Sequence, residues 1–351
     1  MTRARLLLFS FALALLSLAF VEVFLHVVYF AKRGAPIWQT SRAEFAVRDF
    51  TELTEDERVF TARASIEQSF ISFDENRFRR GDNDYLHFPE QIVFLGDSVP
   101  FGMGARAEDS VPSALFRALH SGGNSRLGVI NAALPSYSLR QSIARYRKEV
   151  AGRWATRAVI LQVYDPATQF AMFGQSWSLD DNWANQNAKL SRIKDKKEGG
   201  VRSLFRFSSL YFLYRTIKPG KGDPRLHFRL RRDDEASAAR FSNEVRLELS
   251  GFLDELRKTG TYLFLLPIVH VNEESLSPGL RLTTGLMNEI FAKFAADHPD
   301  VTFIDHRPAL ASHNKQDIFI DDAGHLTRLG AELQAGAILR ALSSQRSLLA
   351  P

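Results

Sequence analysis

The feature that most constrains the fold is an alternation of short apolar runs with helix-length segments, which begins near residue 90. The first run, Ile92-Val93-Phe94-Leu95, ends at a glycine and is typical of a buried strand. The other expected strands are Gly128–Ala132, Ala158–Val163, Tyr262–Leu266 and Val301–Ile304. The expected helices are Val111–His120, Ser138–Val150, Glu244–Lys258, Leu286–Ala296 and Leu329–Leu342. Strands that alternate with helices of about 10–15 residues predict an α/β fold, in which helices cover both faces of a parallel sheet.

The N-terminus carries an apolar run from Leu6 to Phe30, in which Glu22 and His26 are the ionisable groups. A membrane span needs about 20 apolar residues, so residues 1–32 are predicted to be an uncleaved transmembrane anchor that crosses the membrane through residues 6–30. The alternative is a signal peptide, because Ser17-Leu18-Ala19 is a passable cleavage site. Either reading places the remaining chain outside the cytoplasm. We expect a single-pass protein of the inner membrane that faces the periplasm.

Charge and cysteine content narrow the possibilities for the remaining chain. The sequence has no cysteine, which excludes disulfides, thiolate zinc sites and a cysteine nucleophile. Residues 189–232 hold 14 Lys and Arg against three Asp and Glu, a net of +11, while the rest holds 31 against 37, a net of −6. We therefore interpret residues 170–240 as a basic cap inserted into a domain of residues 90–345. Residues 33–89 have no sustained periodicity and are interpreted as a stalk and strap.

Two short motifs suggest where chemistry occurs. Gly96-Asp97-Ser98 directly follows the first strand, and ligands of open parallel sheets bind beyond the carboxyl ends of the strands. A serine hydroxyl is a poor nucleophile until a base lies next to it. Asp322-Ala323-Gly324-His325 precedes the last helix, and an aspartate at this spacing can orient the imidazole. Ser98, His325 and Asp322 are therefore the candidate catalytic residues.

With these two motifs, the region from Ile92 to Leu342 resembles the SGNH/GDSL hydrolase family. The resemblance implies a three-layer α/β/α, flavodoxin-like fold with a parallel five-stranded sheet. It implies ester hydrolysis through an acyl-enzyme on Ser98, with His325 as base and Asp322 as acid, and neither a metal nor an organic cofactor. Membrane-anchored bacterial members are similar in layout.

Two positions depart from the family pattern, and both concern the oxyanion hole. Ser136 stands where a glycine is expected, and its backbone N–H can still donate if the dihedral angles allow it. Tyr164 stands where the family has an asparagine. Either its phenol, the amide of Gln162 or another group substitutes for that donor, whose loss can cost about 10²–10³ in rate, or the enzyme is slow, or the protein is not a hydrolase. The candidate oxyanion hole thus consists of Ser98, Ser136 and Tyr164.

Three functions remain open from the sequence. The first is a membrane-anchored serine esterase that removes acetyl groups from an extracytoplasmic glycan or lipid. The second is an O-acetyltransferase of cell-surface polysaccharide that uses the same three residues. The third is a catalytically impaired binding or assembly factor with this fold. The expected partners are the ester-bearing substrate and the membrane, with no nucleic acid, and the sequence carries no signal for an oligomeric state.

Overall fold

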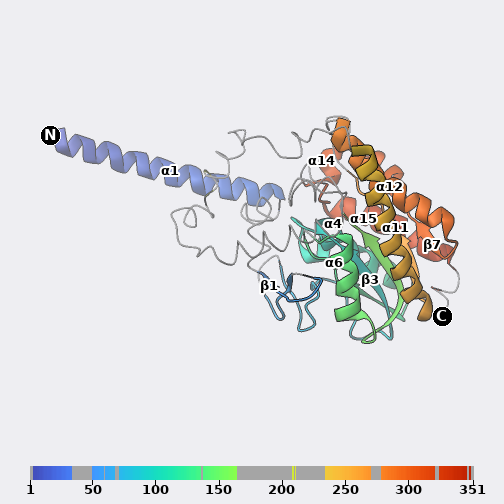
Figure 1. The fold of residues 1–351 in the computed structure, drawn as a ribbon. Helices are drawn as coiled ribbons and strands as arrows, with labels where there is room; N and C mark the ends of the chain where they lie inside the picture. Colours follow the sequence, from blue (N-terminus) through green and yellow to red (C-terminus); the bar gives the residue numbers. More distant parts are fainter. Residues whose placement is uncertain are drawn as a thin grey trace.

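A five-stranded parallel sheet forms the centre of the computed structural model (Figure 1). The structure describes residues 3–33, 50–58, 60–67, 71–135, 137–163, 208, 210, 234–269, 278–320, 324–345 and 348. The strands are β3 (Glu90–Gly96), β4 (Leu127–Asn131), β5 (Ala155–Gln162), β6 (Tyr262–Leu265) and β7 (Val301–Phe303). Their order is β4-β3-β5-β6-β7, and every neighbouring pair is parallel. This is the flavodoxin-like order, and the predicted α/β fold is confirmed.

Helices cover both faces of the sheet because successive strand residues point to opposite sides. In β3, Val93 and Leu95 pack with α6, α11 and α12, whereas Ile92 and Phe94 pack with α5 and α15. The helices on the first face are α6 (Leu139–Arg145), α11 (Asp234–Lys258) and α12 (Pro278–Asp297). Those on the second face are α5 (Val111–Ser121), α13 (Arg307–Ala311), α14 (Lys315–Ile318) and α15 (Arg328–Ser344). The architecture therefore has three layers, as expected.

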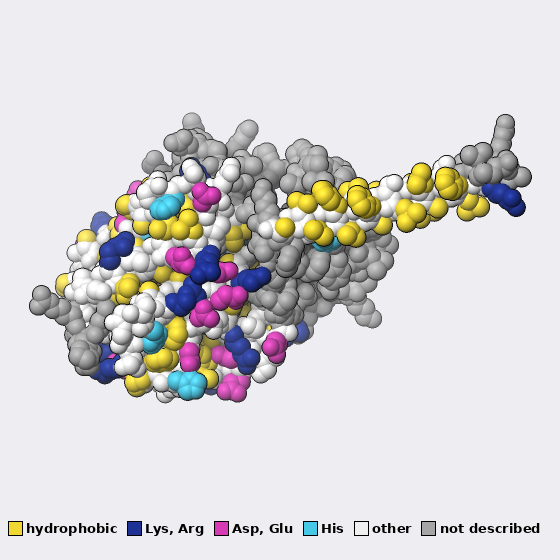
Figure 2. Space-filling view, turned by 180° about the vertical axis from the view of Figure 1, so that it is seen from behind, with side chains coloured by type: hydrophobic (Ala, Val, Ile, Leu, Met, Phe, Trp, Pro, Cys, Tyr) yellow, Lys and Arg dark blue, Asp and Glu magenta, His cyan; other side chains and the backbone are white. Residues whose placement is uncertain are grey.

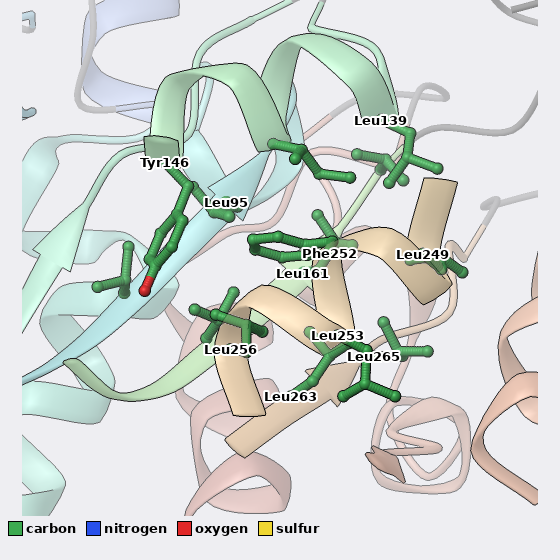
Figure 3. Packing of buried hydrophobic residues seen from close by; sticks show 14 of the residues in the cluster. Leu95, Leu139, Tyr146, Leu161, Leu249, Phe252, Leu253, Leu256, Leu263 and Leu265 are labelled. Carbon is green, nitrogen blue, oxygen red and sulfur yellow. The ribbon is translucent and has the colours of Figure 1, made fainter. Parts of the chain in front are cut away.

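The first face has a continuous apolar core (Figure 3). Phe252 and Leu256 of α11 lie against Leu161 of β5 and Leu263 of β6, all fully buried. Tyr146 closes this cluster with an edge-on contact to Phe252 at a ring-centroid distance of 5.3 Å. Burying each such side chain contributes about 1.5–3 kcal/mol, so this core fixes the strands whose carboxyl ends carry the candidate site.

The helix expected over Ser138–Val150 is not α-helical along its whole length. It begins with a capping box in which Ser138 and Gln141 exchange side-chain and backbone hydrogen bonds, and its α-helical part ends at Arg145. The next five residues, Tyr146–Val150, form a π turn named η2. A π turn changes the angular spacing of side chains, a detail that apolar periodicity does not encode.

Described residues between 50 and 89 pack against the region that follows β3 and β4. β1 (Thr51–Leu53) and β2 (Phe60–Ala62) pair antiparallel. Phe50, Phe60 and Phe73 are buried in a cluster that includes side chains following β3 and β4. The segment consists mostly of loops, so its apolar residues occur at irregular intervals. Sequence periodicity therefore could not identify them as core.

The N-terminal helix α1 (Arg3–Arg33) projects away from this domain and exposes apolar side chains along its length (Figures 1 and 2). Its apolar stretch, Leu8–Val28, is long enough to cross a membrane, and a signal sequence has the same character. Glu22 and His26 share a face as expected, with Nε2 of the histidine 3.0 Å from Oε1 of the glutamate. The predicted basic cap of residues 170–240 lies almost entirely outside the described residues.

Candidate active site

Ser98 lies at the carboxyl end of β3, where the strand turns sharply into a one-turn helix. α4 (Ser98–Phe101) begins at this residue, and Asp97 caps it by accepting a hydrogen bond from the Val99 backbone N–H at 3.1 Å. Gly96 has a φ of +138°, and a Cβ there would lie 1.8 Å from the carbonyl oxygen of Gln162. The turn therefore requires glycine, because β5 passes too close for a side chain.

His325 reaches the same edge of the sheet from the loop that precedes α15. Its carbonyl accepts from the Ile320 N–H at 2.7 Å, and Thr327 caps α15 through the Gly330 N–H at 3.3 Å. Gly324 lies immediately before it, and a Cβ there would approach the carbonyl oxygen of Val269 to 2.5 Å. The chain at Gly324 thus passes close to the segment that follows β6, and this packing fixes the backbone from which the His325 imidazole projects.

The two motifs meet in space although 227 residues separate them in the chain. Nε2 of His325 lies 2.9 Å from Oγ of Ser98, which is hydrogen-bond distance. His325 is buried, whereas Ser98 is half-buried and so retains contact with solvent. A hydroxyl held at this distance from an imidazole nitrogen has the geometry for proton transfer. The other predicted site residues, Asp322, Ser136 and Tyr164, lie outside the described residues.

Gln162, considered above as a substitute amide donor, has a different position. Its side chain is 2% exposed, and its Nε2 donates to the carbonyl of Pro267 at 3.0 Å. Its Oε1 accepts from Nε2 of Gln334 on α15, also at 3.0 Å. The amide therefore connects β5 to the end of β6 and to α15. With its donor directed at Pro267, it holds the sheet edge together instead of facing a substrate.

Other histidines near strand ends have different environments. Asp84 and His87 have the same spacing as Asp322 and His325, but His87 is 81% exposed and its pair with Asp84 lies on the surface. His306 is fully buried after β7, and this burial lowers its pKa to about 4, so its imidazole is neutral at neutral pH. Within the described ranges, no group of three or more His, Asp or Glu side chains could hold a metal ion.

Two residues beside Ser98 were not singled out from the sequence. Asp97 is 2% exposed and caps α4, and its position directly before a serine at a strand end was the available signal. Arg79 is equally buried and donates to carbonyls of the loop that follows Ser98. It comes from a segment without periodicity, so no sequence pattern pointed to it.

No protein-family model matches the chain, and no curated protein matches it significantly. The chain is similar to solved structures. One is a member of the lipolytic G-D-S-L family from Veillonella parvula, at 14% identity and a TM-score of 0.42, covering 72% of this chain and 98% of that one. A second is a lipase/acylhydrolase from Enterococcus faecalis, at 15% identity and a TM-score of 0.42, covering 73% of this chain and 96% of that one. A third is a catalytic mutant of an acetylxylan esterase from Geobacillus stearothermophilus, at 13% identity and a TM-score of 0.42, covering 73% of this chain and 94% of that one.

Proposed function

We propose that the protein is a serine esterase with Ser98 as nucleophile and His325 as general base. The observation that carries this proposal is the 2.9 Å distance between the Ser98 hydroxyl and His325 Nε2 at the carboxyl end of the sheet. Ser98 and His325 come from opposite ends of the domain, and the helix cap at Asp97 and the turn at Gly96 fix the serine independently. Two motifs that are each weak evidence when taken alone thus lie within hydrogen-bond distance of each other.

The chemistry follows the acyl-enzyme route. His325 takes the hydroxyl proton as the Ser98 oxygen attacks the ester carbonyl carbon, which gives a tetrahedral oxyanion. Collapse of this intermediate breaks the bond to the alcohol, and His325 returns its proton to the leaving oxygen. Water, deprotonated by His325, then attacks the acyl-serine to give a second tetrahedral intermediate. This intermediate expels the Ser98 oxygen, which takes the proton back from His325 as the carboxylic acid leaves. Asp322, three residues before the base, is proposed to orient the imidazole and stabilise its charged form.

The oxyanion is proposed to be held by the Ser98 N–H, the Ser136 N–H and the Tyr164 hydroxyl. Ser98 opens α4, and a helix leaves its first N–H groups without an intrahelical acceptor. Ser136 and Tyr164 follow β4 and β5 in the chain, which are the two strands that flank β3. Parallel strands end at a common edge, so the topology favours these two positions as the partners of Ser98.

The proposed substrate is an acetyl ester on a glycan or lipid outside the cytoplasm, with α1 as a membrane anchor. The 21-residue apolar stretch of α1 and its exposed side chains support the anchor. A transferase that passes the acyl group to a sugar hydroxyl shares every step up to the acyl-enzyme. A non-catalytic factor would keep the fold and lose the nucleophile's reactivity.

The test is to label the full-length protein in detergent with a fluorophosphonate and to measure p-nitrophenyl acetate hydrolysis. Ser98→Ala should abolish labelling, and Ser98→Ala and His325→Ala should each lower kcat by at least about 10³-fold, because the two residues act as a unit. Ser121→Ala and His87→Ala are matched controls on the exposed surface and should retain wild-type rates. Failure of the wild type to label at Ser98 would refute the esterase and the transferase together. Labelling with acyl transfer to added glycan but little hydrolysis would favour the transferase.

A further inference from the structure

Arg79 is a buried cation beneath the loop that carries Ser98. It lies in the segment between β2 and β3 and is 2% exposed. Its guanidinium carbon lies 4.3 Å from the ring centroid of Phe101, the last residue of α4. Its own backbone N–H donates to the carbonyl of Asn131 at the end of β4, at 3.2 Å. Arg79 is thereby fixed from both its backbone and its side chain.

The Arg79 guanidinium donates to three carbonyls of the loop after Ser98. Nη1 donates to the carbonyls of Phe101 and Gly102, the latter at 2.8 Å, and Nη2 donates to the carbonyl of Ala105 at 2.9 Å. A planar guanidinium presents its donors in a fixed fork, so these carbonyls are held at fixed relative positions. One side chain thus defines the path of the loop from residue 101 to residue 105.

α4 is a single turn, so few of its carbonyls are hydrogen-bonded within the helix. The carbonyls of Ser98 and Val99 accept from the N–H groups of Met103 and Gly102, each at 2.9 Å. The carbonyls further along the turn accept longer hydrogen bonds from outside the helix: Phe101 from Nδ2 of Asn131 at 3.3 Å, and Gly102 from the Ala105 N–H at 3.2 Å. Arg79 adds charged donors to these carbonyls, at an end of the turn where its dipoles favour a positive charge.

Burial lowers the pKa of the Arg79 guanidinium to about 9, while the charge of Glu108 opposes this effect. The group therefore remains charged at neutral pH. A charged donor makes stronger hydrogen bonds to carbonyls than a neutral one.

From these contacts we infer that Arg79 is a positioning residue for Ser98: it fixes the turn that holds the nucleophile in reach of His325. This inference rests on the proposed function. A displacement of about 1 Å at a reacting group can lower the rate about 10²-fold, so a loosened turn should act on kcat and leave KM nearly unchanged. The segment of residues 50–89 would then be part of the catalytic apparatus.

The experiment compares full-length wild type with Arg79→Met, which keeps the approximate volume and removes the charge, and with Arg79→Lys. We expect Arg79→Met to slow fluorophosphonate labelling and to lower kcat by about 10²-fold at unchanged KM. Arg79→Lys should recover part of this loss, since it keeps a cation without the fork. The matched control is Arg63→Met, an exposed arginine in the same segment that donates to the Thr51 carbonyl, and it should behave as wild type.

Amide hydrogen exchange separates this inference from the proposed function. In Arg79→Met, the N–H groups of Gly102 and Met103 should exchange at least about tenfold faster, while that of Ile160 in β5 stays protected. Unchanged exchange at Gly102 and Met103 would overturn the inference, whether or not Ser98 reacts. If the fluorophosphonate labels Ser98 in the wild type, an Arg79→Met variant that is labelled at the same rate would overturn the inference too. If Arg79→Met fails to fold, the same measurements are made on Arg79→Lys, for which we expect smaller changes.

Discussion

The loops after β3 and β4 are each held by a buried arginine, but the two arginines sit in different electrostatic surroundings. Arg79 directs its guanidinium at the carbonyl dipoles of residues 101, 102 and 105. Arg145 donates to the carbonyl of Ala133 at 3.3 Å and also forms an ion pair with Glu149, with its Nε 2.9 Å from Oε2. The first contact acts on the candidate nucleophile's turn, and the second on the loop that leads to Ser136.

Arg145, Glu149 and Arg58 form a buried network of charged side chains. Glu149 receives hydrogen bonds from Arg58 at 2.5 Å and from the Thr61 hydroxyl at 2.6 Å, both from the segment 50–89. Arg145 also donates to the carbonyl of Arg77 at 2.5 Å. Burial by itself would raise the pKa of Glu149, but Arg145, Thr61 and Arg58 lower it below its ordinary value. The carboxylate is therefore charged in the folded protein.

The difference between the two sites predicts that the two arginines have different roles. Removing one member of a buried ion pair leaves another charge poorly compensated, and the cost appears as lost stability. Removing a donor from carbonyl groups near a nucleophile changes a local backbone path, and the cost appears in the rate. The Arg145 network should therefore matter most for folding, and Arg79 for catalysis.

The largest expected effect on stability is that of Arg145→Met. Arg145 is fully buried and Glu149 keeps Arg58 as a partner, so we expect a loss of about 3 kcal/mol in the free energy of unfolding. Urea denaturation measures it. Arg147→Met is the matched control two residues away, because Arg147 is one-third exposed and its pair with Glu255 should be worth less than about 1 kcal/mol. Equal losses in the two variants would contradict the comparison.

Acidification should reproduce part of the same effect. The folded pKa of Glu149 lies below its ordinary value of 4.5, so its stabilising contribution is complete above pH 4.5 and is lost as the pH falls through the folded pKa. Urea midpoints measured from pH 7 to pH 3 should fall more steeply for wild type than for Glu149→Gln. Parallel profiles would show that Glu149 does not carry this dependence. Arg79 stays charged from pH 3 to pH 7 because its pKa is about 9, so its own titration should add nothing to the slope.

The smallest expected effect is that of Tyr137→Phe. The buried Tyr137 hydroxyl donates to the carbonyl of Phe60 and so connects the loop after β4 to β2. Its loss should cost about 1 kcal/mol of stability, the net value of one buried hydrogen bond. Thermal unfolding measures it. A change in kcat larger than that of Arg79→Met would reverse the assignment of roles.

The sequence predicted the sheet because strands and helices leave periodic apolar patterns. β3, β6 and α15 begin and end within a few residues of the expected ranges. It also indicated Ser98 and His325, since a short motif at a strand end is visible in the chain itself. Arg79 and Arg145 were not predictable in this way. Their partners are backbone carbonyls and charges brought near by folding, as with Arg58 and Glu149, which are 91 residues apart.

The 227-residue separation of Ser98 and His325 also has a consequence in time. At about 5–20 residues per second, synthesis makes the proposed nucleophile roughly 10–45 s before the proposed base. During that interval the growing chain holds Ser98 without the imidazole that is proposed to activate it. If the proposed function holds, ester cleavage therefore begins only after the loop that carries His325 has been made and folded.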